Sequence, residues 1–155
     1  MTLIVLDMRM NSDYKELFDI FSNSVEAFIR EVKNKKSTLM ATDEWTVKDE
    51  LSHITFWHEN YAVNYKALAE YKDPPLPEGM STINMAGVLS LRKCSIKELV
   101  SRLRKANRSL CTSIVVKKVP RMTYSKGGST YETPDFLEMI SRHINTHTKQ
   151  VKRAK

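Results

Sequence analysis

Apolar side chains recur at steps of three and four residues along most of this chain, which is the spacing of one buried face on an α-helix. The first such stripe covers a segment from Ser12 or Asp13 to about Lys35, and polar residues fill its opposite face. Because a helix with one apolar stripe must bury it against other elements, the pattern favours a fold made of packed helices. The members of this stripe are Tyr14, Leu17, Phe18, Phe21, Val25, Phe28, Ile29 and Val32.

Two further stripes follow sequence signals that start helices. Thr46 stands three residues before Asp49, which predicts a capping box at the start of a second helix that ends before Asp73-Pro74-Pro75. Ser95 and Glu98 have the same spacing and predict the start of a third helix. The apolar positions of these two helices are Val47, Leu51, Ile54, Trp57 or His58, Tyr61, Tyr65 and Leu68, then Ile96, Leu99, Val100, Leu103, Ala106, Leu110 and Ile114.

A fourth helix is predicted near the end of the chain, from Thr133 as its cap to about Lys152. Pro134 suits the first helical position, and Asp135 suits the positive end of the helix dipole. Residues 119–133 precede this helix and predict a loop or a short hairpin. The inward positions of the helix are Phe136 or Leu137, Ile140, His143 or Ile144, His147 and Val151.

The connection between the second and third helices predicts how the chain runs. Residues 72–94 extend to more than about 70 Å at ~3.3 Å per residue, about twice the length of a helix of roughly 25 residues. Such a crossover can return the chain to the end at which the second helix began, so that the second and third helices are parallel. We therefore expect an all-α, up-down-down-up four-helix bundle. A chain of 155 residues fits one such domain (1–155), with residues 1–11 as an N-terminal extension.

Charge and cysteine content limit the classes of partner. The net charge of +7 permits contact with nucleic acid, but the lysines are spread over all the helices and no DNA-binding motif appears, which disfavours that function. Cys94 and Cys111 form no CxxC motif; a disulfide between them stays open, and a reduced chain is the simpler interpretation. The start has neither a basic leader nor a long apolar run, and no segment approaches the ~20 apolar residues of a membrane span. We expect a cytoplasmic protein without a membrane partner.

Three of the four histidines predict a metal site. His143 and His147 are four residues apart, so one helix face presents both imidazoles, as in zinc proteases with an HExxH motif. Ile144 stands where that motif has glutamate, so protease chemistry is not supported. His53 lies about 10 Å from the start of the second helix, and the other pair lies about 10 Å from the end of the antiparallel fourth helix. The three side chains can therefore meet at one level of the bundle.

The alternative interpretation is that these histidines are hydrogen-bonded core residues without a metal. A buried imidazole without a partner costs ~1–3 kcal/mol, so each ring needs either a hydrogen-bond partner or a cation. The convergence of three rings at one level favours the cation. His58 follows Trp57 directly, and we expect it to be peripheral to the site.

The segment 44–57 reads EWTVKDELSHITFW and resembles the signature of the DinB/YfiT-like superfamily, in which a tryptophan precedes S/T-V-K-D and a histidine closes the second turn of the second helix. The spacing of His143 and His147 matches the second half of that signature. Within the superfamily, the sequence looks closest to the ClbS/DfsB group, whose members do not all keep the three histidines.

The resemblance implies a four-helix bundle, often a homodimer, with a divalent metal ion (zinc, nickel or iron) on His53, His143 and His147. Relatives include S-transferases and isomerases that use the thiols bacillithiol, mycothiol or glutathione, and a resistance protein that opens the cyclopropane of a genotoxin. It therefore implies a small-molecule substrate and, in the thiol-dependent branch, a low-molecular-weight thiol.

Three imidazoles leave a tetrahedral metal ion with one open position, which is the catalytic pattern. The hypothesis is a metal-dependent hydrolase or thiol-dependent transferase that attacks a small electrophilic molecule, in detoxification or stress protection. The alternative is a non-catalytic protein of the ClbS/DfsB type that sequesters a small molecule. Asp49 is the first candidate for an outer hydrogen-bond partner of a ligand histidine and Glu50 the second, although capping and solvent exposure are the commoner roles of both. Trp45, Trp57 and Tyr61 are candidates for the wall of a pocket, although core packing is their commoner role.

Overall fold

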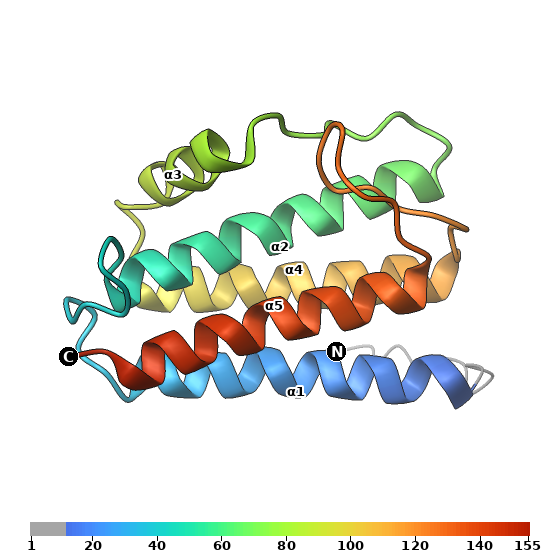
Figure 1. Ribbon diagram of the computed structural model, residues 1–155. Helices are drawn as coiled ribbons and strands as arrows, with labels where there is room; N and C mark the ends of the chain where they lie inside the picture. Colours follow the sequence, from blue (N-terminus) through green and yellow to red (C-terminus); the bar gives the residue numbers. More distant parts are fainter. Residues whose placement is uncertain (1–11) are drawn as a thin grey trace.

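Four long helices form a bundle in the computed structural model, which describes residues 12–155. They are α1 (Ser12–Lys33), α2 (Val47–Ala69), α4 (Ile96–Val116) and α5 (Thr133–Arg153). Figure 1 shows that α1 and α5 run in one direction and that α2 and α4 run in the other. The predicted up-down-down-up topology is confirmed, while the predicted extension 1–11 lies outside the described residues. None of the described helices is both long and apolar enough to cross a membrane.

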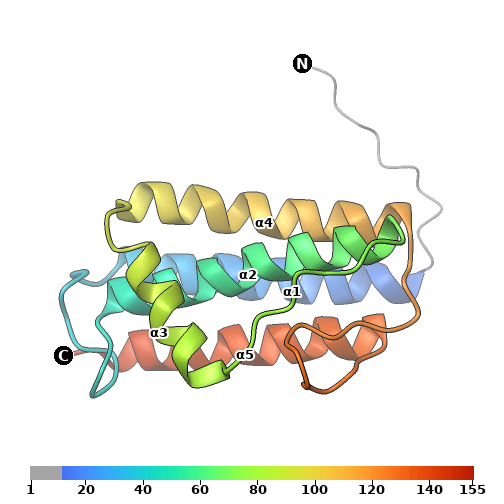
Figure 2. The same cartoon turned by 90° about the horizontal axis from the view of Figure 1, so that it is seen from above.

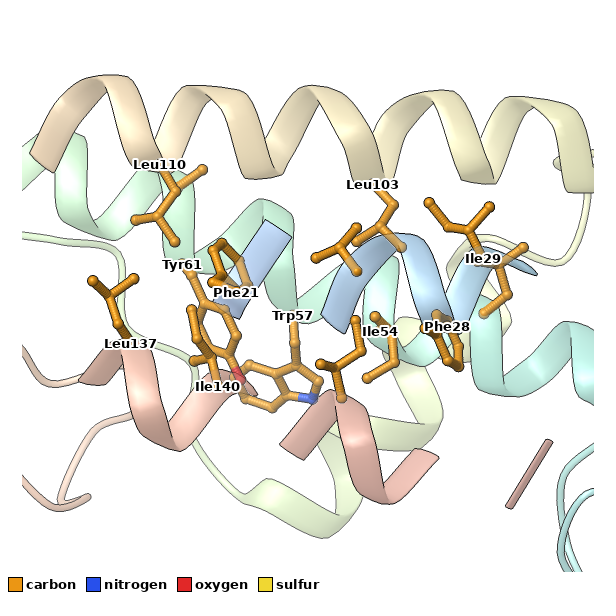
Figure 3. Close-up of a cluster of buried hydrophobic side chains, with 14 of the residues drawn as sticks. Phe21, Phe28, Ile29, Ile54, Trp57, Tyr61, Leu103, Leu110, Leu137 and Ile140 are labelled. Atoms are coloured by element: carbon orange, nitrogen blue, oxygen red, sulfur yellow. The ribbon is translucent and has the colours of Figure 1, made fainter. Parts of the chain in front are cut away.

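The apolar stripes predicted from the sequence meet in the middle of this bundle. Helix α2 packs mainly on α4, and α1 packs mainly on α5. Each fully buried aliphatic or aromatic side chain of this core stabilises the fold by about 1.5–3 kcal/mol relative to exposure. The residues labelled in Figure 3 are Phe21, Phe28 and Ile29 from α1, Ile54, Trp57 and Tyr61 from α2, Leu103 and Leu110 from α4, and Leu137 and Ile140 from α5.

Two of the three predicted helix caps form as expected. Thr46 with Asp49, and Ser95 with Glu98, make reciprocal capping boxes at the starts of α2 and α4. The prediction for Thr133 was wrong, because α5 already includes this residue and no side chain caps its start.

The hydroxyl of Thr133 is used in tertiary packing instead. It donates to the carbonyl of Val119 over 2.9 Å and lies 3.2 Å from the hydroxyl of Tyr65. That tyrosine oxygen accepts the backbone N–H of Val119 over 3.1 Å. A buried hydroxyl with these partners is not available to a helix start, and the three residues tie α2 to the chain before α5.

The long crossover contains an additional helix that the sequence did not predict. Helix α3 (Met80–Ser90) crosses the outer side of α2 on the side that faces α5, as Figures 1 and 2 show together. It has no amphipathic stripe and is rich in serine, threonine, asparagine and glycine, so no helical signal stands out. Tertiary contacts hold it: the indole N–H of Trp57 donates to Asn84 over 2.8 Å. Gly87 lies so close to Phe56 that an added Cβ would meet that ring at 2.6 Å.

Two irregular segments complete the surroundings of α2 and α5. Met122 and Tyr131 exchange backbone hydrogen bonds of 2.7 and 2.8 Å, which makes a small hairpin of the segment before α5. At the other end, Met40 and Lys155 exchange two backbone hydrogen bonds of 3.1 Å, which ties the end of α5 to the segment before α2. Cys94 and Cys111 are both free.

Candidate metal centre

The structure brings together the three histidines that the sequence singled out. His53 projects from α2, and His143 and His147 project from successive turns of the antiparallel α5. The Nε2 atom of His143 lies 3.4 Å from Nε2 of His53 and 3.1 Å from Nε2 of His147. One ring nitrogen from each residue lies within 4.8 Å of the other two, so the three could hold one metal ion.

Burial keeps the imidazoles of His53 and His143 in the neutral form that binds metals. His53 is 3 % exposed and His147 is 9 % exposed, while His143 is partly buried. Desolvation, and next the neighbouring rings of His147 and His143, lower the pKa of His53 from 6.5 to about 2. Desolvation and the proximity of His147 lower the pKa of His143 to about 4. Both rings are therefore uncharged at neutral pH, and a lone pair is available on each.

A buried glutamate lies behind the cluster. The carboxyl group of Glu50 is fully enclosed, and its Oε2 is in direct contact with Nδ1 of His147. The contact places the proton of a neutral His147 on Nδ1, so that its Nε2 lone pair faces the other two rings. Glu50 therefore takes the outer position for which Asp49 was the first candidate.

Asp49 does not serve the site, because its carboxylate belongs to the capping box of α2. Its Oδ2 accepts the backbone N–H of Thr46 over 3.1 Å and the hydroxyl of Thr46 over 2.8 Å. The same capping box that the sequence predicted already commits this side chain. Glu50 is three residues before His53, so the two share a helix face, and this spacing is the signal that could have identified it.

The unsatisfied atoms at the cluster fit a bound cation. Three Nε2 atoms face one another, and they cannot all be satisfied by mutual hydrogen bonds while each ring carries one proton. The second carboxyl oxygen of Glu50, Oε1, is buried and has no hydrogen-bond partner in the part of the chain that the structure describes. In its ionised form such a group is costly unless a positive charge lies close by. A divalent cation among the Nε2 atoms would accept all three lone pairs and would compensate the carboxylate across the ring of His147.

The three imidazoles form part of the wall of an open cleft. The cleft has a volume of about 440 Å³, within the range of pockets that bind small molecules. It is formed by helices α2, α3 and α5, by the hairpin and by the segment before α2. Its lining residues are Trp45, His53, Trp57, Tyr61, Met80, Asn84, Tyr124, Met139, Arg142, His143, Thr146 and His147.

Aromatic rings shape the cleft beside the histidines. The ring of Trp45 lies 4.7 Å from that of His53, and its indole N–H is buried without a partner among residues 12–155. Trp57 and Tyr61 each make edge-to-face contacts with Tyr124 of the hairpin at 5.7 and 5.6 Å. Of the predicted aromatic residues, Trp57 and Tyr61 thus pack in the core and also line the cleft, whereas Trp45 is half-buried and lines the cleft. Tyr124, Asn84 and Met80 were missed, because they come from segments without a periodic pattern.

The fourth histidine does not join the cluster but is buried near it. His58 is 1 % exposed, and its ring is stacked on Phe21 at 5.5 Å. Neither ring nitrogen has a partner among the described residues. Desolvation, with smaller effects from the rings of His143 and His147, lowers the pKa of His58 from 6.5 to about 3. His58 therefore lies outside the cluster, as expected, and its ring is buried in the core.

Comparison with known proteins gives a structural match without a sequence match. No known protein family matches the sequence, and no curated protein does. A solved structure described as the crystal structure of the mycothiol-dependent maleylpyruvate isomerase superimposes with a TM-score of 0.71 at 10% sequence identity. The chain therefore shares the helical-bundle fold of that structure. The match covers 92% of this chain and 63% of that chain, so this protein spans less than two thirds of its structural neighbour.

Replacement of the buried His58 should make stability less dependent on pH. The folded-state pKa lies below the ordinary 6.5, so below pH 6.5 the unfolded chain binds the extra proton and stability falls as the pH drops toward about 3. The substitution His58→Phe removes this group, so it should reduce the slope of the unfolding free energy against pH by up to about 1.4 kcal/mol per pH unit.

The measurement is urea unfolding of chelator-treated wild type and His58→Phe between pH 7.5 and 5. A packing cost of the larger phenylalanine ring would change the free energy of unfolding of the variant by the same amount at every pH. The quantity that tests the role of His58 is therefore the difference between the two proteins in the slope of that free energy against pH. Parallel curves would contradict the assigned role of His58.

Proposed function

We propose that this protein is a divalent-metal-dependent enzyme that uses water or a low-molecular-weight thiol to attack a small electrophilic molecule. The observation that carries the proposal is the convergence of three imidazole Nε2 atoms at the wall of an open cleft. A structural metal site is closed by four protein ligands, whereas three ligands beside a cleft leave a position for a reactant.

Thiol-dependent transfer or isomerisation is the favoured reaction type. The structural neighbour is named as a mycothiol-dependent isomerase, and its likeness to this chain extends over 92% of the residues. Zinc, nickel and iron in the divalent state are the metals proposed, since imidazole suits all three. When bound, the metal supplies Lewis-acid chemistry, because it lowers the pKa of a water or thiol that it coordinates.

The residues of this chain prepare the site for that chemistry. Burial keeps His53 and His143 neutral, so their lone pairs are available at neutral pH. Glu50 holds the Nδ1 proton of His147 and thereby fixes the tautomer and the orientation of that ring. The aromatic wall reduces access of bulk water and gives a flat, apolar surface for an unsaturated ligand.

The metal content of the protein tests the centre directly. Untagged protein should contain about one equivalent of zinc, nickel or iron per chain by elemental analysis. His147→Ala should lose that metal, because two imidazoles remain where three are required. His58→Phe is the matched control, since His58 is a buried histidine of α2 outside the cluster, and it should keep the metal. Metal-free wild-type protein after reconstitution with each of these ions would contradict the centre.

The carboxyl group of Glu50 should strengthen metal binding through its contact with Nδ1 of His147. In Glu50→Gln the side chain keeps its shape but loses the charge, so metal affinity should fall by about 10- to 100-fold. Asp49→Asn is the control, because this neighbouring carboxylate caps α2 and does not touch the cluster. Competition with a fluorescent zinc chelator measures both affinities. Equal losses in the two variants would show that Glu50 has no specific role.

Activity separates an enzyme from a protein that only sequesters a small molecule. Metal-loaded protein is assayed with a panel of thiols (glutathione, bacillithiol and mycothiol) and unsaturated or epoxide acceptors, with water as the competing nucleophile. Turnover that is lost in His53→Ala would support the enzyme. Tight binding of an acceptor without turnover would favour the sequestering protein, for which the open aromatic cleft is sufficient.

A further inference from the structure

The cleft is lined by a positively charged side chain and by no negatively charged one among the described residues. Among the described residues that line it, Arg142 alone carries a permanent charge, and no aspartate or glutamate is present. A ligand in this cleft therefore meets aromatic surface, a few neutral polar groups and one guanidinium.

The guanidinium of Arg142 has no partner within the described part of the chain. By contrast, Arg102 and Arg104 are each held by two short hydrogen bonds to a carboxylate, from Glu59 and Glu26 respectively. Arginine presents a planar fork of donors that fits a carboxylate in two-point contact. The fork of Arg142 is therefore available to a ligand, whereas the forks of the other two are already used.

The position of Arg142 on α5 directs it to the same cleft as the metal centre. It precedes His143 directly, and the cleft also receives Met139 and Thr146, which lie three residues before it and four residues after it. These spacings put Arg142, Met139 and Thr146 on one helix face. The carbonyl of Arg142 accepts the hydroxyl of Thr146 over 3.1 Å, which leaves the guanidinium uninvolved.

We propose that Arg142 binds a carboxylate of the reactants, so that the cleft selects an anionic, unsaturated or aromatic ligand whose reactive end faces the three histidines. The orientation of the ligand's reactive end toward the three histidines rests on the function proposed above. The overall charge of +7 acts in the same direction, because it raises the local concentration of anions. The carboxylate can belong to the electrophile or to the thiol, and both sources use the same recognition chemistry.

Two pairs of probes distinguish the sources. Cinnamate and cinnamamide test the electrophile, and their binding is measured by calorimetry on the protein as purified. The thiols 3-mercaptopropionate and 3-mercaptopropionamide test the cosubstrate, and their binding is measured on cobalt-loaded protein by the thiolate-to-cobalt absorption band. Wild type should prefer the acid over the amide by about fivefold to tenfold in at least one pair, given a charge-assisted contact at a solvent-exposed group.

Arg142→Gln should abolish that preference while the amide of the same pair binds as before. Arg153→Gln is the matched control, because Arg153 is an exposed arginine of the same helix outside the cleft, and it should keep the preference. Equal acid preference in wild type and Arg142→Gln, or no preference in either pair, would overturn the inference. Failure of cobalt to bind would contradict the proposed function alone, because the calorimetric pair needs no metal.

Discussion

Helices α2 and α5 meet at the histidine cluster, although each is held in place by a different partner. Helix α2 packs mainly on α4 and α5 mainly on α1, while contacts between α2 and α5 themselves are few. The separation of the two helices at the cluster is therefore determined by apolar packing elsewhere in the bundle. This constraint lets four polar side chains occupy the gap, because no apolar contact has to be given up there. A site supported by rigid helices in this way is organised before any ligand arrives.

Regular features of the sequence were sufficient to predict the convergence of the histidines. An α-helix advances 1.5 Å per residue, so the distance of His53 from its helix start could be compared with that of His147 from its helix end. The starts themselves were marked by capping boxes at Thr46 and Ser95, which the structure contains. Once the crossover made α2 antiparallel to α5, the cluster followed from counting residues. Whether a metal ion occupies it is a prediction that the metal analysis tests.

The features that could not be predicted depend on competition between partners in three dimensions. Thr133 had the pattern of a helix cap, but its hydroxyl found buried partners at Val119 and Tyr65. Asp49 and Glu50 were both candidates for a contact with a ligand histidine, but Asp49 is held in the capping box and Glu50 contacts His147. Helix α3 has no periodic pattern, so only its contacts with α2 hold it. The spacing of residues in the sequence does not show which of several possible partners a side chain contacts in the folded chain.

The contact between Gly87 and Phe56 has a consequence for the shape of the cleft. Helix α3 carries two residues of the cleft wall, and it can approach α2 this closely because position 87 has no side chain. A larger residue there would collide with the ring of Phe56, so either that ring or the helix would have to shift. Because Met80 and Asn84 line the cleft, a shift of the helix would change the shape of the cleft through a position that does not itself line it.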